Sequence, residues 1–445
     1  MSQKISVIIL GAGKGTRMKS NKSKVLHQVG YLPMIEHVIH GALDLNPNEI
    51  NIVISQEMGD IVKNDLQEKY HNLHFTIQGE RLGTGHAVKL AMENSKIDPN
   101  ICLVLYGDTP FIEKSTLRDI IDNSKQNDVS VLAFDAKDPG SYGRLLTDGS
   151  KLEKIVEFKD ASEKEKKITL CNSGVMAIKG NQVNNLLSQI GNNNASKEFY
   201  LTDIVAIAKR NNLSCSLIKC KEDEVLGVNS KSQLADAEKI FQDKMRSKMM
   251  AGGVTLIDPN SVYFAFDTKI ANDVIIHPNV VFGPNVEIDS FVEIKSFSHI
   301  EGAKISKNSI IGPFARIRPG TNLGEGVKIG NFVEIKKGKI SKGTKINHLS
   351  YIGDANIGEN SNIGAGTITC NYDGYNKFTT NIGCNVFIGS NSALIAPLNI
   401  DDNSMVGAGS VITKDIEKGD LAIARGKQSF IKEGGVKFRN KNLKK

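Results

Sequence analysis

The chain has 445 residues, 40% of them hydrophobic and 24% charged, which is ordinary for a globular protein and leaves room for two or three domains. Its formal charge of +7 arises from Lys and Arg interleaved with Asp and Glu, so there is no basic stripe of the kind that binds nucleic acid. No apolar run is long enough to cross a membrane or to act as a signal peptide, and the six scattered cysteines form no C-x-x-C pair. We therefore expect a cytoplasmic protein with reduced thiols, whose net charge is explained by anionic small substrates.

The first half of the chain alternates short apolar runs with helical stretches, which is typical of an α/β domain with a parallel or mixed sheet. The expected strands are residues 6–10, 50–54, 101–106 and 129–134. In such sheets, ligands bind at the carboxyl ends of the strands. Residues that directly follow these strands are therefore candidates for a binding site.

A glycine-rich segment, Gly11-Ala12-Gly13-Lys14-Gly15-Thr16-Arg17, follows the first expected strand. Its glycines would let backbone N–H groups approach a phosphate chain closely, and its two cationic side chains add positive charge. The segment does not fit the dinucleotide pattern, because Thr16 stands where the last glycine is needed, and it lacks the G-K-S/T ending of a Walker loop. It is either a phosphate-binding loop or only a tight turn at the strand exit.

A second polar landmark is Asp108, which follows the expected strand 101–106. A single Asp in this position is commonly a turn residue or a helix cap. With a candidate phosphate loop upstream, magnesium binding becomes the favoured interpretation.

The second half of the chain carries an apolar residue at every sixth position over long runs, a period that no helix shows. This period, with turn-forming residues between, predicts a parallel β-helix in which three short strands complete one coil. Between Ile270 and Ile412 there is room for about eight coils of roughly 18 residues. Residues 371–375 interrupt the period and are interpreted as a loop that leaves the β-helix, and residues 229–250 predict a connecting helix before it.

Four segments of the first half, residues 10–18, 23–27, 78–87 and 106–108, resemble in order the motifs of sugar-1-phosphate nucleotidylyltransferases. Joined to hexapeptide repeats, they resemble the bifunctional N-acetylglucosamine-1-phosphate uridylyltransferase and glucosamine-1-phosphate N-acetyltransferase family, over about residues 5–435. The resemblance implies an α/β protein with a Rossmann-like nucleotidyltransferase domain on a mixed sheet, a linker helix and a C-terminal left-handed parallel β-helix. It also implies a homotrimer. We expect four parts, namely residues 1–228, 229–250 and 251–425 and a basic C-terminal tail at 426–445.

By resemblance, the first domain joins UTP to N-acetylglucosamine 1-phosphate and releases pyrophosphate. Arg17 and Lys24 would meet the triphosphate as catalytic residues, and Asp108 with Asn229 would hold Mg²⁺. Gln78 would read uracil together with two residues of the same motif. The positions that match the substrate-binding residues of the family are Leu10, Gly11, Ala12, Gly13, Lys24, Gln78, Gly83, Thr84, Tyr106, Gly107, Asp108, Gly143, Glu157, Asn172 and Asn229.

By resemblance, the β-helix transfers an acetyl group from acetyl-CoA to the amine of glucosamine 1-phosphate, with His348 as the catalytic general base. A histidine at a coil corner would otherwise be structural, and its family-like neighbours favour the catalytic role. The positions that match the sugar-phosphate contacts are Arg318, Lys336, Tyr351 and Asn362. Those that match the acetyl-CoA contacts are Ala365, Asn371, Tyr372, Ser390, Ala408 and Arg425.

The product of the second reaction is a substrate of the first, so the resemblance implies synthesis of UDP-N-acetylglucosamine, a precursor of the bacterial cell wall. Two alternatives remain: a nucleotidylyltransferase whose β-helix is only a scaffold, and a non-catalytic protein that kept the fold. The presence of His348 and the 371–375 loop speaks against the scaffold, and the presence of Lys24 and Asp108 speaks against the non-catalytic protein. Ser23 and Gly11 depart from the usual proline and alanine of the family without removing a functional group, and their effect on affinity stays open.

Overall fold

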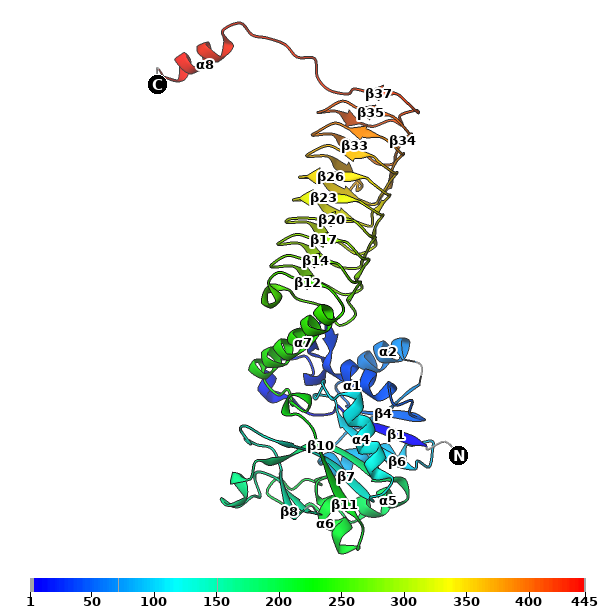
Figure 1. The fold of residues 1–445 in the computed structure, drawn as a ribbon, viewed down its shortest axis with the longest axis vertical. Coiled ribbons are helices and arrows are strands. Elements are labelled where there is room, and N and C mark those ends of the chain that lie inside the picture. Colours follow the sequence, from blue (N-terminus) through cyan, green and yellow to red (C-terminus); the bar gives the residue numbers. More distant parts are fainter. Residues whose placement is uncertain (1–3, 71, 150, 444–445) are drawn as a thin grey trace. The chain divides into compact units, whose positions relative to one another are not determined.

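The structure, a computed structural model, describes residues 4–70, 72–149 and 151–443. The chain divides into two compact units, Met1–Phe241 and Gln242–Lys445 (Figure 1). The division falls inside helix α7 (Lys231–Ala251), close to the connecting helix expected at 229–250. The four-part division expected from the sequence stays a prediction.

The first unit is built on a mixed sheet that follows the order β11-β7-β10-β6-β1-β4-β5, with a β8–β9 hairpin attached to β10. Strand β10 runs antiparallel to β6 and β7, whereas β1 is parallel to β4 and β6. A short β2–β3 pair lies outside this sheet. The strands are β1 (Ile5–Leu10), β2 (Gln28–Val29), β3 (Leu32–Pro33), β4 (Glu49–Ser55), β5 (Leu73–Gln78), β6 (Ile101–Tyr106), β7 (Val129–Asp135), β8 (Arg144–Asp148), β9 (Lys151–Val156), β10 (Leu170–Lys179) and β11 (Cys215–Lys219).

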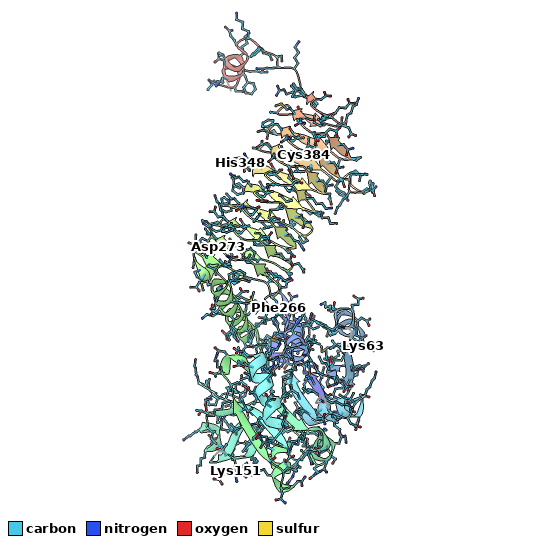
Figure 2. The ribbon with its side chains drawn as sticks, turned by 45° about the vertical axis from the view of Figure 1, so that its right-hand side comes forward. Lys63, Lys151, Phe266, Asp273, His348 and Cys384 are labelled. Atoms are coloured by element: carbon cyan, nitrogen blue, oxygen red, sulfur yellow. The ribbon has the colours of Figure 1, made fainter. Side chains whose placement is uncertain are left out.

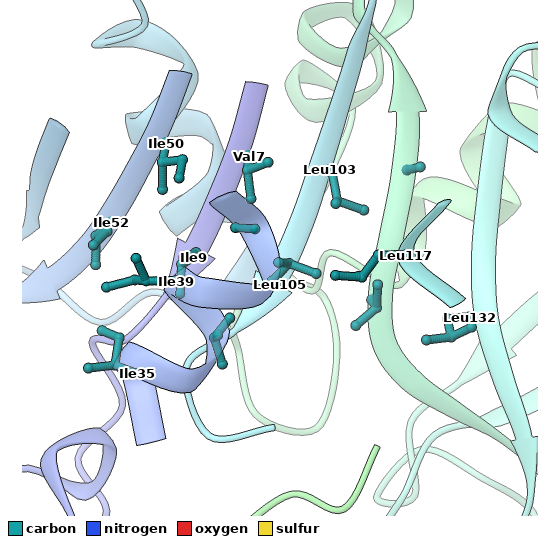
Figure 3. Packing of buried hydrophobic residues seen from close by; sticks show 14 of the residues in the cluster. Val7, Ile9, Ile35, Ile39, Ile50, Ile52, Leu103, Leu105, Leu117 and Leu132 are labelled. Carbon is teal, nitrogen blue, oxygen red and sulfur yellow. The ribbon is translucent and has the colours of Figure 1, made fainter. Parts of the chain in front are cut away.

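Helices cover both faces of this sheet, because the apolar residues of its strands point alternately to either side. Val7 and Ile9 of β1 belong to one buried cluster, which includes Ile35 and Ile39 of helix α1 (Figure 3). Ile8, between them in the sequence, belongs to a second cluster on the other face. The helices of this unit are α1 (Met34–Leu43), α2 (Gly59–Lys69), α3 (Thr84–Glu93), α4 (Lys114–Ser124), α5 (Gly180–Ser188) and α6 (Asp203–Arg210), followed by the first part of α7.

The second unit is a parallel β-helix, in which the described strands stack into three sheets (Figure 1). The first sheet contains β12 (Thr255–Leu256), β14 (Ile275–Ile276), β17 (Glu293–Ile294), β20 (Ile310–Ile311), β23 (Lys328–Asn331), β26 (Lys345–His348), β29 (Asn362–Ile363), β32 (Phe387–Ile388), β35 (Met405–Val406) and β37 (Leu421–Ala422). The second contains β15 (Val281–Phe282), β18 (His299–Ile300), β21 (Arg316–Ile317), β24 (Glu334–Lys336), β27 (Tyr351–Gly353), β30 (Ile368–Cys370), β33 (Ala393–Ile395) and β36 (Val411–Ile412). The third contains β13 (Lys269–Ile270), β16 (Glu287–Ile288), β19 (Ala303–Ile305), β22 (Thr321–Leu323), β25 (Lys339–Ile340), β28 (Ala355–Ile357), β31 (Thr380–Ile382) and β34 (Leu398–Ile400).

The register of the β-helix confirms the six-residue period. Ile270 pairs with Ile288 one coil of 18 residues later, and Ile288 pairs with Ile305 after a coil of 17 residues. The apolar period slips by one residue between Ile300 and Ile305, and this slip corresponds to the shortened coil. The expected excursion is also confirmed, because residues 371–379 leave the coil between β30 and β31.

One corner of the β-helix, between the first and second sheets, presents apolar side chains to the outside. Phe297, Phe314, Phe332 and Leu349 occupy this corner in successive coils, with positive φ and 45 to 62% exposure. The phenyl rings stack with centroid distances of 4.9 and 5.1 Å. Bulky residues rarely adopt this backbone conformation, and we call this set the aromatic ladder.

Beyond the last coil, helix α8 (Gly434–Asn442) forms within the segment that the sequence predicted as a basic tail. Its apolar residues Val436 and Phe438 are 58 and 71% exposed. None of the helices in the described residues is both long and apolar enough to span a membrane.

Candidate functional site

A pocket of about 460 Å³ opens in the first unit where β1, β5 and β6 end. This is the edge at which the sequence analysis expected ligands. The lining residues that were predicted are Leu10, Gly11, Ala12, Gly13, Lys24, Gln78, Gly83, Thr84, Tyr106 and Asp108. The pocket is also lined by Lys14, Val25, Val53, Arg81, Ala87 and Glu198.

The glycine-rich loop is anchored to the strands on either side of β1. The Gly11 N–H donates to the Val53 carbonyl at 2.8 Å, and the Gly107 N–H donates to the Leu10 carbonyl at 2.9 Å. A Cβ added at Gly11 would lie 3.2 Å from that Val53 oxygen, which is a tight contact, whereas one at Gly13 would meet open space. The loop thus has a closely packed base and an open tip, as a phosphate cradle requires.

Lys24, Asp108 and Asn229 form a polar cluster at the pocket. Lys24 pairs with the Asp108 carboxylate, and both side chains are only 13% exposed. Its Nζ also donates to Asn229 Oδ1 at 3.0 Å. Asn229 is brought here from the start of α7 because the Val228 N–H donates to the Asp108 carbonyl at 3.0 Å. The two predicted metal ligands therefore direct oxygen atoms at a single cationic group.

This cluster fits a magnesium ion that shares its coordination shell with substrate phosphates. Mg²⁺ is commonly held by one or two protein oxygens plus phosphates and water. Within the described residues, no group of three or more His, Cys, Asp or Glu could hold a metal alone. One carboxylate and one amide oxygen are therefore the donor set of this cluster.

Gln78 and Gly83 form the wall of the pocket predicted to read a base. Gln78 is buried, and its Nε2 donates to the Gly83 carbonyl at 3.1 Å, which leaves Oε1 able to accept. Gly83 has φ of 113°, and a Cβ there would lie 2.5 Å from the Phe199 carbonyl oxygen. Only glycine is compatible with this close approach of two backbone segments.

The predicted sugar contacts Gly143, Glu157 and Asn172 lie next to one another, although they do not line the 460 Å³ pocket. The Asn172 N–H donates to the Gly143 carbonyl at 2.8 Å, and a Cβ at Gly143 would lie 3.7 Å from Glu157 Oε1. Burial raises the pKa of the Glu157 carboxyl, and Thr202 donates to it at 3.0 Å. Burial, together with the Glu157 charge, raises the pKa of Tyr106.

Arg17 is not among the residues that line the 460 Å³ pocket. It belongs to the short 3₁₀ helix η1 (Thr16–Met18) and is exposed.

His348 ends β26 and is exposed on the surface of the β-helix (Figure 2). Its Nδ1 lies 2.7 Å from Oδ1 of Asn331, which is paired with it one coil earlier. Because an amide oxygen only accepts, Nδ1 carries the proton and Nε2 keeps its lone pair. This is the tautomer that a general base needs.

Four of the six predicted acetyl-CoA residues continue this corner in the coils that follow. Hydrogen bonds of 2.7 to 3.3 Å link each coil to the next along the column. We call the column the histidine corner, and its members are Asn331, His348, Ala365, Ser390, Ala408 and Arg425. The small side chains after His348 leave room for an elongated ligand along the corner.

The predicted phosphate ligands lie at the next corner, between the second and third sheets. Arg318 donates to Glu334 Oε1 at 2.7 Å, and Lys336 ends β24. Lys377, in the excursion loop, lies against Lys336 and lowers the pKa of its ammonium group. We call Arg318, Lys336 and Lys377 the cationic corner.

Tyr351 and Asn371 lie beside the cationic corner, where both side chains lean over Gly353. A Cβ at Gly353 would lie 2.5 Å from the Tyr351 hydroxyl and 2.9 Å from Asn371 Nδ2. Asn371 also donates to the Asp354 carboxylate, and Tyr372, next in the loop, is 58% exposed. The excursion loop is therefore tied to the second sheet at its base.

One chain does not bring all the predicted acetyl-site residues together. Gly353, which pairs with Lys336, follows His348 by five residues, so the two corners lie at opposite ends of one side of the β-helix, separated by a chain path of roughly 16 Å. Asn362 lies in the first sheet, on the other side of the histidine corner from Tyr351. A groove of about 560 Å³ on this unit runs along the third sheet and is lined by none of these residues.

The sequence analysis missed three residues that the structure adds to the sites. Arg81 lines the first pocket, and its Nε donates to the Ala12 carbonyl of the glycine-rich loop at 2.9 Å. Asn331 precedes His348 by 17 residues, one short coil, so the coil period could have revealed it. Lys377 lies in the excursion loop, so it could have been noticed as the cation of that loop.

Comparisons with known proteins agree with both units. A model of the MobA-like NTP transferase domain matches residues 7–169, and a model of the bacterial transferase hexapeptide (six repeats) matches residues 302–337 and 379–414. The bifunctional protein GlmU of a Ruegeria species is 49% identical over 427 residues, covering 95% of this chain and 94% of that protein. GlmU of Paramagnetospirillum magneticum is 47% identical over 442 residues, covering 98% of this chain and 97% of that protein.

A nucleotidyltransferase domain, followed by a left-handed β-helix of hexapeptide repeats, defines a class of bifunctional transferases. Within this class, the chain belongs to the GlmU family, as the near full-length identity shows. This is the family of N-acetylglucosamine-1-phosphate uridylyltransferases and glucosamine-1-phosphate N-acetyltransferases of UDP-N-acetylglucosamine synthesis that the sequence motifs indicated.

Proposed function

We propose that the pocket of the first unit performs uridylyl transfer and that the two corners of the β-helix perform acetyl transfer, with the residues named above in these roles. The observation that carries the proposal is the His348–Asn331 pair, which leaves a basic Nε2 exposed at the head of a column of small residues. A β-helix that served only as a scaffold would need no such tautomer.

In the uridylyl reaction, a phosphate oxygen of N-acetylglucosamine 1-phosphate attacks the α-phosphorus of UTP. The bond between the α-phosphorus and the oxygen that bridges it to the β-phosphorus breaks, and pyrophosphate is released. The glycine-rich loop directs N–H groups at the phosphates, and Lys24 and Arg17 neutralise charge on the leaving group. Gln78 Oε1 is free to accept from uracil N3–H, which supports recognition of this base. Gly143, Glu157 and Asn172 bind the sugar through hydroxyl and amide groups.

Magnesium is the metal that we propose for this pocket, held by Asp108 and Asn229. When bound, Mg²⁺ neutralises the phosphates and aligns them for in-line displacement. The convergence of the two oxygens on the Lys24 ammonium group supports a cation position there.

In the acetyl reaction, the amine of glucosamine 1-phosphate attacks the thioester carbon of acetyl-CoA, and the C–S bond breaks to release CoA. His348 Nε2 accepts the proton that the amine loses, while Arg318, Lys336 and Lys377 bind the phosphate. Acetyl-CoA lies along the histidine corner and contacts Asn371 and Tyr372 of an excursion loop.

We propose a homotrimer whose acetyl site is shared between copies. The amine and the phosphate of glucosamine 1-phosphate sit on neighbouring ring carbons. His348 and the cationic corner of one chain, in contrast, lie at opposite ends of one side of the β-helix, separated by a chain path of roughly 16 Å. The aromatic ladder lies at the corner that carries His348, and its 45 to 62% exposure favours burial against a second copy. That copy would supply the cations that complete the site.

We further propose a cytoplasmic location. All six cysteines lie in the described part of the chain, and none of them forms a disulfide, which suits a reducing compartment.

The test is a paired assay of His348→Ala and Asp108→Ala. Release of CoA is followed with acetyl-CoA and glucosamine 1-phosphate, and release of pyrophosphate with UTP and N-acetylglucosamine 1-phosphate. We expect His348→Ala to lower CoA release by about 100-fold or more and to spare pyrophosphate release, with the reverse for Asp108→Ala. If the wild-type protein releases pyrophosphate but never CoA, the β-helix is only a scaffold and the acetyl-transfer proposal is wrong.

A further inference from the structure

We propose that Lys24 is a specificity-determining residue that makes the first pocket take a divalent cation only together with a nucleotide. The proposal rests on the uridylyl function proposed above and adds a selectivity to that site. Its basis is that the Lys24 ammonium group is bonded to both Asp108 Oδ2 and Asn229 Oδ1, the two oxygens assigned to the metal.

The ammonium group and a divalent cation exclude one another at this position. A magnesium or manganese ion bound to both oxygens would lie about 2 Å from each of them. Lys24 Nζ already lies 3.0 Å from the Asn229 oxygen and in direct contact with the Asp108 carboxylate, so it fills the same space. Even if both cations could be accommodated, their repulsion at such a distance would be strong in a pocket where Lys24 and Asp108 are only 13% exposed.

A free metal ion must therefore displace Lys24 from a buried ion pair without offering the ammonium group a new anionic partner. Breaking such a pair and leaving one charge alone is costly. A metal–nucleotide complex avoids this cost, because its phosphates enter the pocket that Lys24 lines and receive the displaced ammonium group. The same event fills the metal position and brings Lys24 onto the triphosphate.

Because of this exchange, Lys24 weakens the binding of free metal ions and strengthens the binding of the metal–nucleotide complex. A residue with only a structural role would not have these opposite effects. We expect Lys24→Met to bind free Mn²⁺ about tenfold or more tightly than wild type, because the competing charge is gone. The same variant should bind Mn²⁺–UTP about tenfold more weakly, because the phosphates lose a cation. The affinity for free Mn²⁺ can be measured by the loss of the free Mn²⁺ electron paramagnetic resonance signal. The affinity for Mn²⁺–UTP can be measured by equilibrium dialysis of labelled UTP at a Mn²⁺ concentration that converts UTP to its complex.

The matched control is Lys14→Met, which removes the same charge from the lining of the same pocket, where Lys14 is exposed at the loop tip. Its affinity for free Mn²⁺ should change by less than about twofold, because it does not contact Asp108 or Asn229. The double variant Lys24→Met with Asp108→Asn should lose the tight Mn²⁺ binding, which assigns that binding to this carboxylate. Lys24→Ala serves as a second variant if circular dichroism shows that Lys24→Met does not fold.

Free Mn²⁺ binding by Lys24→Met or Lys24→Ala that is equal to or weaker than in wild type would overturn the proposal. Failure of the proposed function gives a different result, namely no pyrophosphate release by the wild-type protein. The metal competition can be measured in either case, so the two failures are distinguishable.

Discussion

The two sites of this chain differ in how their charges are partnered. In the first unit, Lys24 is paired with Asp108 and Asn229 inside a pocket of about 460 Å³, so one chain supplies both the cation and its counter-charges. In the β-helix, Lys336 lies against Lys377, and the pKa of Lys336 is lowered because two like charges face each other. The charges of the first site are therefore paired within one chain before any ligand binds. In the second site, two neighbouring ammonium groups repel each other until an anion binds to them.

The architecture of each unit explains this difference. Parallel strands of an open sheet end at one edge, and loops from β1, β5 and β6 surround a hollow there. A β-helix is convex at its corners, so residues of neighbouring corners face outward in different directions. A site on such corners can be enclosed only by a second surface. We therefore expect the acetyl site to be shared between copies.

Substitution of Lys336 at the cationic corner should have the largest effect of those considered for the two sites. Lys336→Met should lower kcat/KM for glucosamine 1-phosphate by about 100-fold, because a charged hydrogen bond to phosphate is lost, and should leave pyrophosphate release unchanged. The exposed Lys339→Met, three residues further along on the third sheet, is the matched control. Equal losses in both variants would mean that net charge, and not this corner, matters.

A smaller effect is expected at Asn331, which orients His348. Asn331→Ala should lower the rate of acetyl transfer about fivefold, the equivalent of one hydrogen bond. Asn331→Asp keeps an acceptor oxygen for the His348 Nδ1–H and should restore most of this rate. Asn356→Ala removes an amide elsewhere, on the third sheet, and equal losses in Asn331→Ala and Asn356→Ala would argue against the pair.

In the first unit, Arg81 ties the glycine-rich loop to the segment that carries Gln78. It donates to the Ala12 carbonyl at 2.9 Å and to Glu57, which is 79% exposed, at 2.7 Å. Arg81→Gln should lower kcat/KM for UTP about fourfold, whereas Glu57→Gln, which breaks only an exposed ion pair, should change it less than about twofold. If the two variants behave alike, the tether to Ala12 has no role in binding.

The smallest effect concerns the pH dependence of phosphate binding. Lys336 binds phosphate in its charged form, and Lys377 lowers its pKa, so charge is lost as pH rises through a lower value than for an ordinary lysine. Lys377→Gln should raise the pKa of Lys336 and move the alkaline fall of kcat/KM to higher pH. A profile whose alkaline limb stays in place would contradict the contact between the two amines.

The sequence predicted most of the fold because its periods are local. The six-residue period determines which residue faces the core of the β-helix. The strands of the α/β unit are visible as local apolar runs, such as residues 6–10 and 101–106. Motifs located the strand-end residues Gly11 and Asp108, but Arg81, Asn331 and Lys377 act through contacts between segments that no local pattern reveals. Likewise, the aromatic ladder could not be predicted, because its residues share a corner at which the backbone has positive φ, and the sequence does not reveal that conformation.

Whether the acetyl site is completed between copies can be decided by mixing two inactive variants. His348→Ala and Lys336→Ala proteins are dissociated, combined in equal amounts and reassociated, and CoA release is measured. If each site takes His348 from one copy and Lys336 from another, random pairing leaves about a quarter of the sites intact, and activity returns to about that fraction of wild type. If no activity returns while the mixture reassembles and still releases pyrophosphate, each chain carries both residues of its own site and the acetyl site is not shared.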